Sequence, residues 1–268
     1  MASRSRKAPR KPKGQRRTIG RRIAPARVES ARRRPGNPIR FRRLFLVIVV
    51  QFEPLPESFY KPSAEIVAPR LLGHFLIRNT PDGPCGGPIV ETEAYLIGDP
   101  ACHGFIGKTP RNASLYGPPG RAYVYLIYGF HFCFNAVCHP LGSAEAVLVR
   151  AIEVLYGEEF MRAHRTVTAL HQLTSGPGKL CAALDIDRKF DGLDICDAGA
   201  PVFIARNPAQ KEFLIEKSPM VTTRRVGITK AAEMPLRFYL EGSPYVSRRI
   251  KPGVTPLRKA HDKSSDKF

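Results

Sequence analysis

The sequence lacks three features that would assign it to other classes of protein. It has no apolar run near the roughly 20 residues that a membrane-spanning helix needs, since the longest, residues 44–50, has seven. Its N-terminus has no apolar segment followed by a small-residue cleavage site, which argues against a secretory signal peptide. Its six cysteines form no C-x-x-C pair and are widely scattered, which argues against a small disulfide scaffold. We therefore expect a reduced, intracellular protein without a membrane segment, in the cytoplasm or nucleoid if the source is bacterial.

Acidic residues are almost absent from the first 50 positions. This segment holds 17 Lys and Arg but one acid, Glu29, and so carries +16 of the formal net charge of +20. A basic, aromatic-poor segment buries too little apolar surface to offset its ordering entropy, so we expect residues 1–50 to be a disordered tail. It is either a polyanion-binding arm or a dispensable extension. No Met lies between Met1 and Met161, so a start downstream of this tail in a bacterium would use a non-AUG codon, at Val47, Val49 or Val50.

The remaining chain shows neither internal repeats nor a regular alternation of strands and helices. We therefore predict a single α+β domain at residues 51–250 on a mixed, mostly antiparallel sheet, followed by a basic C-terminal tail at 251–268 that could touch phosphate. The pattern predicts a helix that leads into a strand at 64–78, a turn at 79–87 and a second helix at 158–173. It predicts six further strand segments, at 88–94, 123–137, 146–154, 202–205, 213–215 and 236–240.

Two groups of residues carry the chemistry. Glu91 and Glu93 are two positions apart on a predicted strand and so share one face. Carboxylates serve glycoside chemistry, in which an oxocarbenium-like transition state needs a base, nucleophile or anion nearby, although an exposed strand face has the same pattern. Residues 123–134 are rich in aromatic side chains, which could stack on nucleic acid bases or fill a core. We expect Tyr123 and Tyr125 to share a face, and Asn135 at the end of this run is less easily explained by packing.

Seven segments in order closely resemble the alkyladenine (3-methyladenine) DNA glycosylase family, over roughly residues 54–248. They are Val90-Glu-Thr-Glu-Ala-Tyr95, Thr109-Pro-Arg-Asn112, Tyr123-Val-Tyr-Leu-Ile-Tyr-Gly129, Phe132-Cys-Phe-Asn135, Val147-Leu-Val-Arg-Ala151, Ser175-Gly-Pro-Gly-Lys-Leu-Cys181, and Pro235-Leu-Arg-Phe-Tyr239 with Gly242-Ser-Pro-Tyr-Val-Ser247. Seven motifs in matching order are far more specific than any one of them.

The resemblance implies roles for individual residues at the reaction centre. Glu93 matches the general base that takes a proton from the attacking water. Arg150 matches the arginine that helps hold this water, and the main-chain carbonyl of Val226 matches its third contact. Glu91 has no catalytic role in this mapping and is expected to be structural.

Other matching residues would recognise the damaged base. Tyr95, His103 and Tyr125 match the aromatic walls between which the extruded base stacks, and the His103 backbone matches the group that reads the purine edge. Asn135 matches the pocket-floor residue that excludes the exocyclic amine of guanine. Tyr128 matches the side chain that enters the minor groove and fills the gap left by the flipped nucleotide.

The sequence departs from the family pattern at the pocket. The segment between Tyr95 and His103 is one residue shorter than in familiar members, and Phe130 and His131 replace a methionine and an aromatic residue. Lys179, in the segment 175–179, is either a DNA-backbone contact or part of an ordinary turn.

A metal site receives little support. Cys133, Cys138 and His139 are close in sequence, but a strand would place the two cysteines on opposite faces, and no fourth ligand is evident. We therefore expect neither a metal nor a cofactor.

The resemblance implies a monomeric, monofunctional purine DNA N-glycosylase of base-excision repair. It would flip alkylated or otherwise damaged purines out of double-stranded DNA, hydrolyse the N-glycosidic bond with water and leave an abasic site. Two other classes stay open, namely a catalytically silent binder of damaged nucleic acid and an RNA-associated protein suggested by the Arg-rich tail.

Overall fold

The computed structural model describes residues 51–249. The tails expected at 1–50 and 251–268, the apolar run 44–50 and the alternative start positions lie outside the described residues. None of the helices in the described part of the chain has both the length and the apolar character needed to cross a membrane.

The described chain contains eight strands, five α-helices and four short 3-10 helices. The strands are β1 (Phe75–Thr80), β2 (Gly83–Tyr95), β3 (Ala122–Ile127), β4 (His131–Cys138), β5 (Glu145–Ile152), β6 (Val202–Ala205), β7 (Met220–Thr223) and β8 (Arg237–Leu240). The α-helices are α1 (Glu57–Tyr60), α2 (Ala64–Leu71), α3 (Glu158–His164), α4 (Pro177–Ala183) and α5 (Gln210–Glu216). The 3-10 helices are η1 (His103–Ile106), η2 (Ala113–Tyr116), η3 (Leu170–Leu173) and η4 (Arg188–Phe190).

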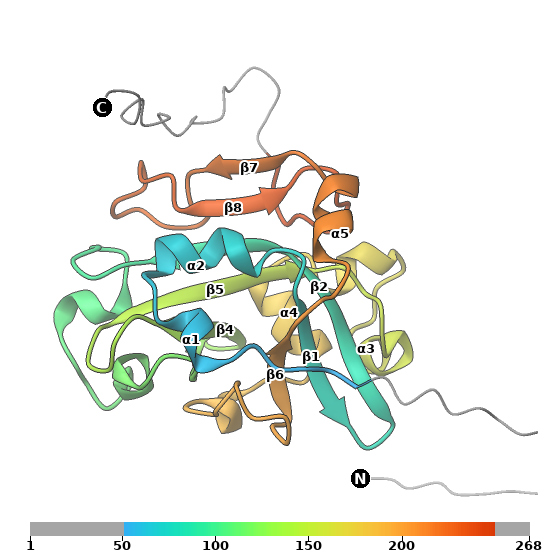
Figure 1. Ribbon diagram of the computed structural model, residues 1–268, viewed down its shortest axis with the longest axis horizontal. Coiled ribbons are helices and arrows are strands. Elements are labelled where there is room, and N and C mark those ends of the chain that lie inside the picture. The colour runs from blue at the N-terminus through green and yellow to red at the C-terminus, as the bar shows by residue number, and fades with distance from the viewer. Residues whose placement is uncertain (1–50, 250–268) are drawn as a thin grey trace, which may run out of the picture. The chain divides into compact units, whose positions relative to one another are not determined.

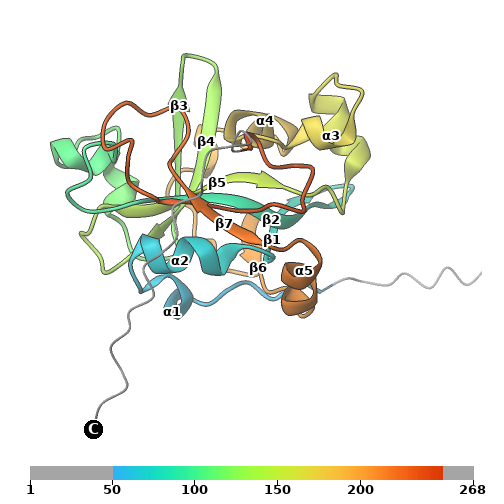
Figure 2. The same ribbon diagram turned by 90° about the horizontal axis from the view of Figure 1, so that it is seen from above.

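The strands form one sheet in the order β3-β4-β5-β2-β1-β6, with β8 joining β2 and β7 pairing with β8. Each strand pair is antiparallel. Helix α2 packs against β2 and β5 on one side of the sheet, and α4 packs against β4 and β5 on the other (Figures 1 and 2). The prediction of an α+β domain on a mostly antiparallel sheet is confirmed.

Strand β2 is the centre of this arrangement. Its first half pairs with β1, and its second half pairs with β5, while residues 91–93 also pair with β8. The segment that carries both glutamates is therefore flanked by strands on both sides, and Glu91 and Glu93 are fully buried. A carboxylate in such a place must be paired with hydrogen-bond donors or cations.

Glycine explains why β2 begins earlier than the sequence predicted. Residues 79–87 were expected to form a turn, but β2 already starts at Gly83. Gly86 has a φ of +145° and lies so close to β1 that a Cβ there would be 1.9 Å from the Leu76 carbonyl oxygen. Glycine in this segment therefore permits close strand packing and does not end the strand.

Two other expected elements differ in the structure. Residues 213–215, expected as a strand, lie in helix α5, because a run of three apolar residues has no periodicity that separates helix from strand. The helix expected at 158–173 ends at His164, where Arg165 takes an extended backbone conformation with φ −145°, and only η3 follows.

The segment 123–137 forms a hairpin of β3 and β4. The Phe130 N–H donates to the Ile127 carbonyl oxygen, and the two residues between them, Tyr128 and Gly129, have φ values of +53° and +79°. Positive φ at both central positions is the mark of a type I′ turn. Figure 2 shows this hairpin projecting beyond the rest of the sheet.

Candidate active site

A cavity of about 360 Å³ lies between η1, the β3–β4 hairpin, the start of α4 and the loop at 226–228. Seven of the eight site residues predicted from the sequence line it: Tyr95, His103, Tyr125, Tyr128, Asn135, Arg150 and Lys179. The eighth, Glu93, is fully buried and contacts residues of the cavity wall. The structure thus brings together side chains from six separate parts of the sequence.

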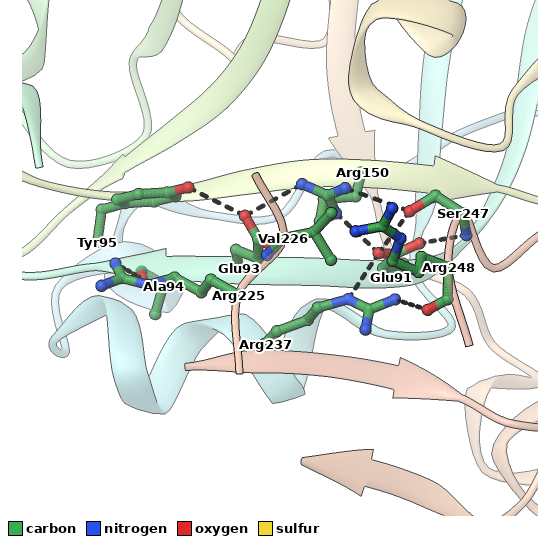
Figure 3. A network of polar contacts seen from close by, with 10 residues as sticks. All are labelled: Glu91, Glu93, Ala94, Tyr95, Arg150, Arg225, Val226, Arg237, Ser247 and Arg248. Atoms are coloured by element: carbon green, nitrogen blue, oxygen red, sulfur yellow. Dashed lines mark hydrogen bonds and ion pairs between the residues drawn. The ribbon is translucent and has the colours of Figure 1, made fainter. Parts of the chain in front are cut away.

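Glu93 is held by three residues that line the cavity (Figure 3). Its Oε2 atom accepts a hydrogen bond from the Tyr95 hydroxyl at 3.0 Å and lies 3.1 Å from Nη1 of Arg150. Its Oε1 atom accepts a hydrogen bond from the main-chain N–H of Val226 at 2.7 Å. Because a carboxylate offers about four lone-pair positions, Oε1 retains capacity for one further donor.

Arg150 reaches both glutamates because of an irregularity in the sheet. The register between β2 and β5 shifts so that Glu91 faces Ala151 while Thr92 faces Val149, which leaves Arg150 between the paired positions. Bulges of this kind redirect a side chain and are common beside active sites. Burial opposes the charge on Arg150, but Glu93 and Glu91 raise the pKa of its guanidinium, so it stays protonated.

Glu91 is saturated with donors. Its Oε1 accepts from Nε of Arg150 at 2.7 Å, Nε of Arg237 at 2.8 Å and the Ser247 hydroxyl at 2.8 Å, and its Oε2 accepts from the Ser247 N–H at 2.7 Å. Burial by itself would raise the pKa of this carboxyl, but the charges of Arg150 and Arg237 together with the Ser247 N–H hold the pKa below its ordinary value. Glu91 is therefore ionised and fully occupied, as expected for a structural residue.

Aromatic rings form the walls of the cavity. The rings of Tyr123 and Tyr125 lie on one face of β3 with centroids 5.2 Å apart, as the alternation predicted. The His103 ring lies 4.4 Å from the Tyr125 ring, and its Nδ1 is 2.7 Å from the Tyr123 hydroxyl. The shorter segment after Tyr95 thus still delivers His103 to the cavity. Burial, helped by Arg111, lowers the pKa of His103, which favours a neutral imidazole at pH 7.

Asn135 is fixed in position on β4. Its Nδ2 group donates to the carbonyl oxygens of Tyr123 at 2.9 Å and Cys133 at 3.4 Å, and only 3% of the residue is exposed. Two bonds to main-chain atoms hold the amide in one orientation. A ligand that clashes with this side chain could not easily displace it.

The thiols near the cavity are kept protonated by burial. Burial raises the pKa of Cys133 to about 11 and that of Cys102 to about 11, so both are neutral at pH 7. Cys133 and Cys138 belong to different core clusters on β4, which agrees with the predicted opposite faces. Within residues 51–249 no group of three or more His, Cys, Asp or Glu side chains is arranged to hold a metal ion.

The rim of the cavity carries exposed residues. Tyr128 and Phe130 at the tip of the hairpin are large aromatic residues, yet they are 72% and 71% exposed. Lys179, near the start of α4, is exposed as well. Large exposed aromatic side chains beside a cavity indicate a surface that binds a partner.

The family can be stated on this basis. The family model for methylpurine-DNA glycosylase (MPG) matches residues 58–244. The chain belongs to this family. It is therefore a DNA glycosylase of base-excision repair, a monofunctional hydrolase that acts on the N-glycosidic bond of alkylated purines.

Relatives from three organisms match most of the chain, and each is provisionally named a 3-methyladenine DNA glycosylase. The protein of Methanoculleus marisnigri is 47% identical over 195 residues, which cover 73% of this chain and 99% of the relative. The protein of Agrobacterium fabrum is 46% identical over 199 residues, covering 74% and 94%. That of Carboxydothermus hydrogenoformans is 44% identical over 195 residues, covering 73% and 99%.

Sequence reasoning did not find four residues that build the candidate site. Arg237 and Ser247 hold Glu91, while Asp99 and Arg225 form a buried ion pair beside Tyr95. Arg237 and Ser247 lie in segments that match the family. The resemblance identified these segments but did not reveal which residues they contact. Asp99 and Arg225 are 126 positions apart, and no local pattern reveals such a pairing.

Proposed function

We propose that this glycosylase flips a damaged purine out of double-stranded DNA into the cavity and that Glu93 activates the water that displaces it. The observation that carries the proposal is the position of Glu93, which is fully buried and bonded to Tyr95, Arg150 and Val226, three residues of the cavity wall. A carboxylate beside an oxocarbenium-like transition state can act as a general base.

The bonds to Glu93 indicate where the water would bind. Oε2 already accepts from Tyr95 and Arg150, whereas Oε1 accepts from the Val226 N–H alone. We infer that the water donates to Oε1 and that its proton moves there as its oxygen attacks the anomeric carbon. Arg150 would hold the same water, with the Val226 carbonyl as its third contact.

The aromatic walls suit a purine, above all a positively charged one. Tyr95, His103 and Tyr125 surround the cavity with rings, and a cationic base is attracted to the faces of such rings. An alkylated cationic purine is also a good leaving group without further protonation. Since His103 is held neutral, it adds no positive charge that would repel this base.

Discrimination and extrusion would depend on two further residues. The rigidly bonded Asn135 would clash with the exocyclic amine of guanine and so exclude that normal base. Tyr128 at the exposed hairpin tip would enter the minor groove and occupy the gap left by the flipped nucleotide. Lys179 at the rim would contact the DNA backbone.

Single-turnover kinetics test the proposal. The substrate is a duplex with one ethenoadenine or hypoxanthine, and methylated DNA is used in parallel. We expect wild type to release the base and Glu93→Gln to lose about 10²- to 10⁴-fold in rate, the range for a general acid or base, while duplex binding persists.

The control is Glu158→Gln, which removes an exposed carboxylate paired with Arg162 on α3. It should keep the wild-type rate. Binding without release by wild type on every lesion would make the protein a recognition module, and strong preference for structured RNA would contradict the DNA assignment. We further propose that the enzyme acts inside the cell as a monomer, to be checked by fractionation and by sedimentation.

A further inference from the structure

A second buried ion pair lies directly behind the cavity wall. Asp99 and Arg225 pair through both guanidinium Nη groups, with Nη2 of Arg225 at 3.0 Å from Oδ1 of Asp99. Both side chains are completely buried. A buried pair of this kind is costly to desolvate and contributes little to stability in general, so its presence here calls for another role.

The pair touches one wall of the cavity from behind. The Arg225 guanidinium carbon lies 4.7 Å from the centre of the Tyr95 ring, and its Nη1 donates to the Ala94 carbonyl oxygen at 3.0 Å. Figure 3 shows the guanidinium beneath this ring. Arg225 therefore supports the ring of Tyr95, whose hydroxyl holds Glu93.

The pair also fixes the loop that carries Val226, the main-chain contact of Glu93. Arg225 directly precedes Val226, whose N–H donates to Oε1 of Glu93 at 2.7 Å. The anchored Arg225 side chain determines where this N–H lies. A shift of the loop would move both the N–H and the adjoining carbonyl, which are the groups around the proposed water.

Asp99 organises a third part of the site. Its Oδ1 accepts from the Ala101 N–H at 2.9 Å, and its carbonyl oxygen accepts from the Cys102 N–H at 2.9 Å. These bonds shape the turn that ends at His103. One ion pair therefore joins the Tyr95 ring, the Val226 loop and the His103 turn.

We propose that Asp99 and Arg225 form a positioning pair that aligns Glu93 and the attacking water with the extruded base. This inference rests on the proposed function of Glu93. Because both side chains are completely buried, the pair acts through Tyr95 and Val226. It should control the rate of bond cleavage, with little influence on duplex affinity.

The test uses Arg225→Lys, Asp99→Asn and the double variant in the full chain. Lysine keeps the charge but loses the planar fork that makes two bonds at once. The matched control is Arg206→Lys, which changes an exposed pair with Glu53. Three quantities are measured on an ethenoadenine duplex: the dissociation constant, the ethenoadenine fluorescence that reports extrusion, and the single-turnover rate at saturating enzyme.

We expect each single variant to lose about 10- to 100-fold in rate, since a displacement near 1 Å can cost that much, with the dissociation constant within about threefold of wild type. The double variant should be no slower than the slower single variant, because residues that act as a unit are not additive. The control should keep the wild-type rate. If a single variant gives no cooperative melt, Asp99→Leu with Arg225→Met replaces the pair by apolar side chains, and the same loss of rate is expected.

Three results would overturn the inference. They are wild-type rates in the variants, losses that disappear at saturating enzyme, and losses that multiply in the double variant. Failure of the proposed function is distinguishable, because wild type itself would then release no base. If wild type and the variants all release the base at the same rate, the proposed role of Glu93 stands and only the positioning role of Asp99 and Arg225 is refuted.

Discussion

Replacing Glu91 by glutamine should weaken the fold without removing a group that reacts. Glu91 accepts four hydrogen bonds, two from buried arginines and two from Ser247, and none of its side chain is exposed. Glutamine has nearly the same shape but no charge. Its NH₂ group would also point a donor at groups that are donors themselves. Arg150 and Arg237 would then both lose the carboxylate of Glu91 as a buried partner.

The magnitude follows from the burial of the network. Removing one partner of a buried ion pair costs about 3–5 kcal/mol, because the other charge stays behind without compensation. For a domain of 150–250 residues, 1 kcal/mol shifts the Tm by about 2–4 °C. Glu91→Gln should therefore lower the Tm by about 6–20 °C. Arg150 keeps its contact with Glu93, which limits the loss.

The effect should also depend on pH in a defined direction. Burial would raise the pKa of Glu91, but Arg150 and Arg237 hold it below the ordinary value of 4.5. Because the unfolded chain then binds the proton more tightly, the stabilisation is present above about pH 4.5 and is lost as pH falls through the lower folded pKa. The difference in stability between wild type and Glu91→Gln should shrink in that window.

Urea denaturation between pH 3 and pH 7, together with thermal melts, measures both effects. Glu158→Gln is the control, because its ion pair with Arg162 is exposed and such helix pairs contribute about 0.3–0.5 kcal/mol. A Tm for Glu91→Gln within 2 °C of wild type, or a difference that does not depend on pH, would refute the assigned role of Glu91.

Four further predictions concern other parts of the chain. Asn135→Ala should increase release of guanine from undamaged DNA relative to wild type, as measured by mass spectrometry of freed bases. Tyr128→Gly should raise stability by about 1 kcal/mol, because φ is +53° there, yet weaken extrusion of the lesion by at least tenfold in the ethenoadenine fluorescence assay. Burial, Arg206 and Arg70 lower the pKa of His74 to about 4, so stability should fall as pH drops from about 6.5 towards 4, and His74→Gln should flatten that slope in urea titrations. Deleting residues 1–50, which carry 17 Lys and Arg, should reduce the salt dependence of duplex binding measured by anisotropy.

The sequence predicted those parts of the fold that local pattern determines. The aromatic and β-branched run at 123–137 became the β3–β4 hairpin, and 202–205 and 236–240 lie in or overlap strands. Predictions for segments without periodicity were less accurate, as residues 213–215 illustrate, which were predicted as a strand and lie in α5. The strand at Gly86 was missed because its glycine serves a close approach to β1, which is a property of the partner strand.

The site was predicted through motifs, and its internal bonding was not. The order of the motifs indicated Glu93 and seven of the residues that line the cavity. A match to family motifs gives the positions of such residues in the sequence, but it does not say which atoms contact each other. The partners of Glu91 and Glu93 come from distant segments, since Ser247 is 156 positions from Glu91 and Val226 is 133 from Glu93. Such pairings depend on sheet register and on loops that cross the sheet.

The two glutamates show what the structure adds to the chemistry. They share a strand and a face, and a pair of carboxylates usually suggests a glycosidase in which one acts as acid and the other as base or nucleophile. Glu91 cannot serve as the acid, because its pKa is lowered and its oxygens are occupied by Arg150, Arg237 and Ser247. If Glu93 is the base as proposed, the described residues that line the cavity include no carboxylic acid to protonate a leaving group. A base that is already cationic can leave without such help, whereas a neutral lesion must obtain its proton elsewhere. We therefore expect alkylated cationic purines to be the faster substrates.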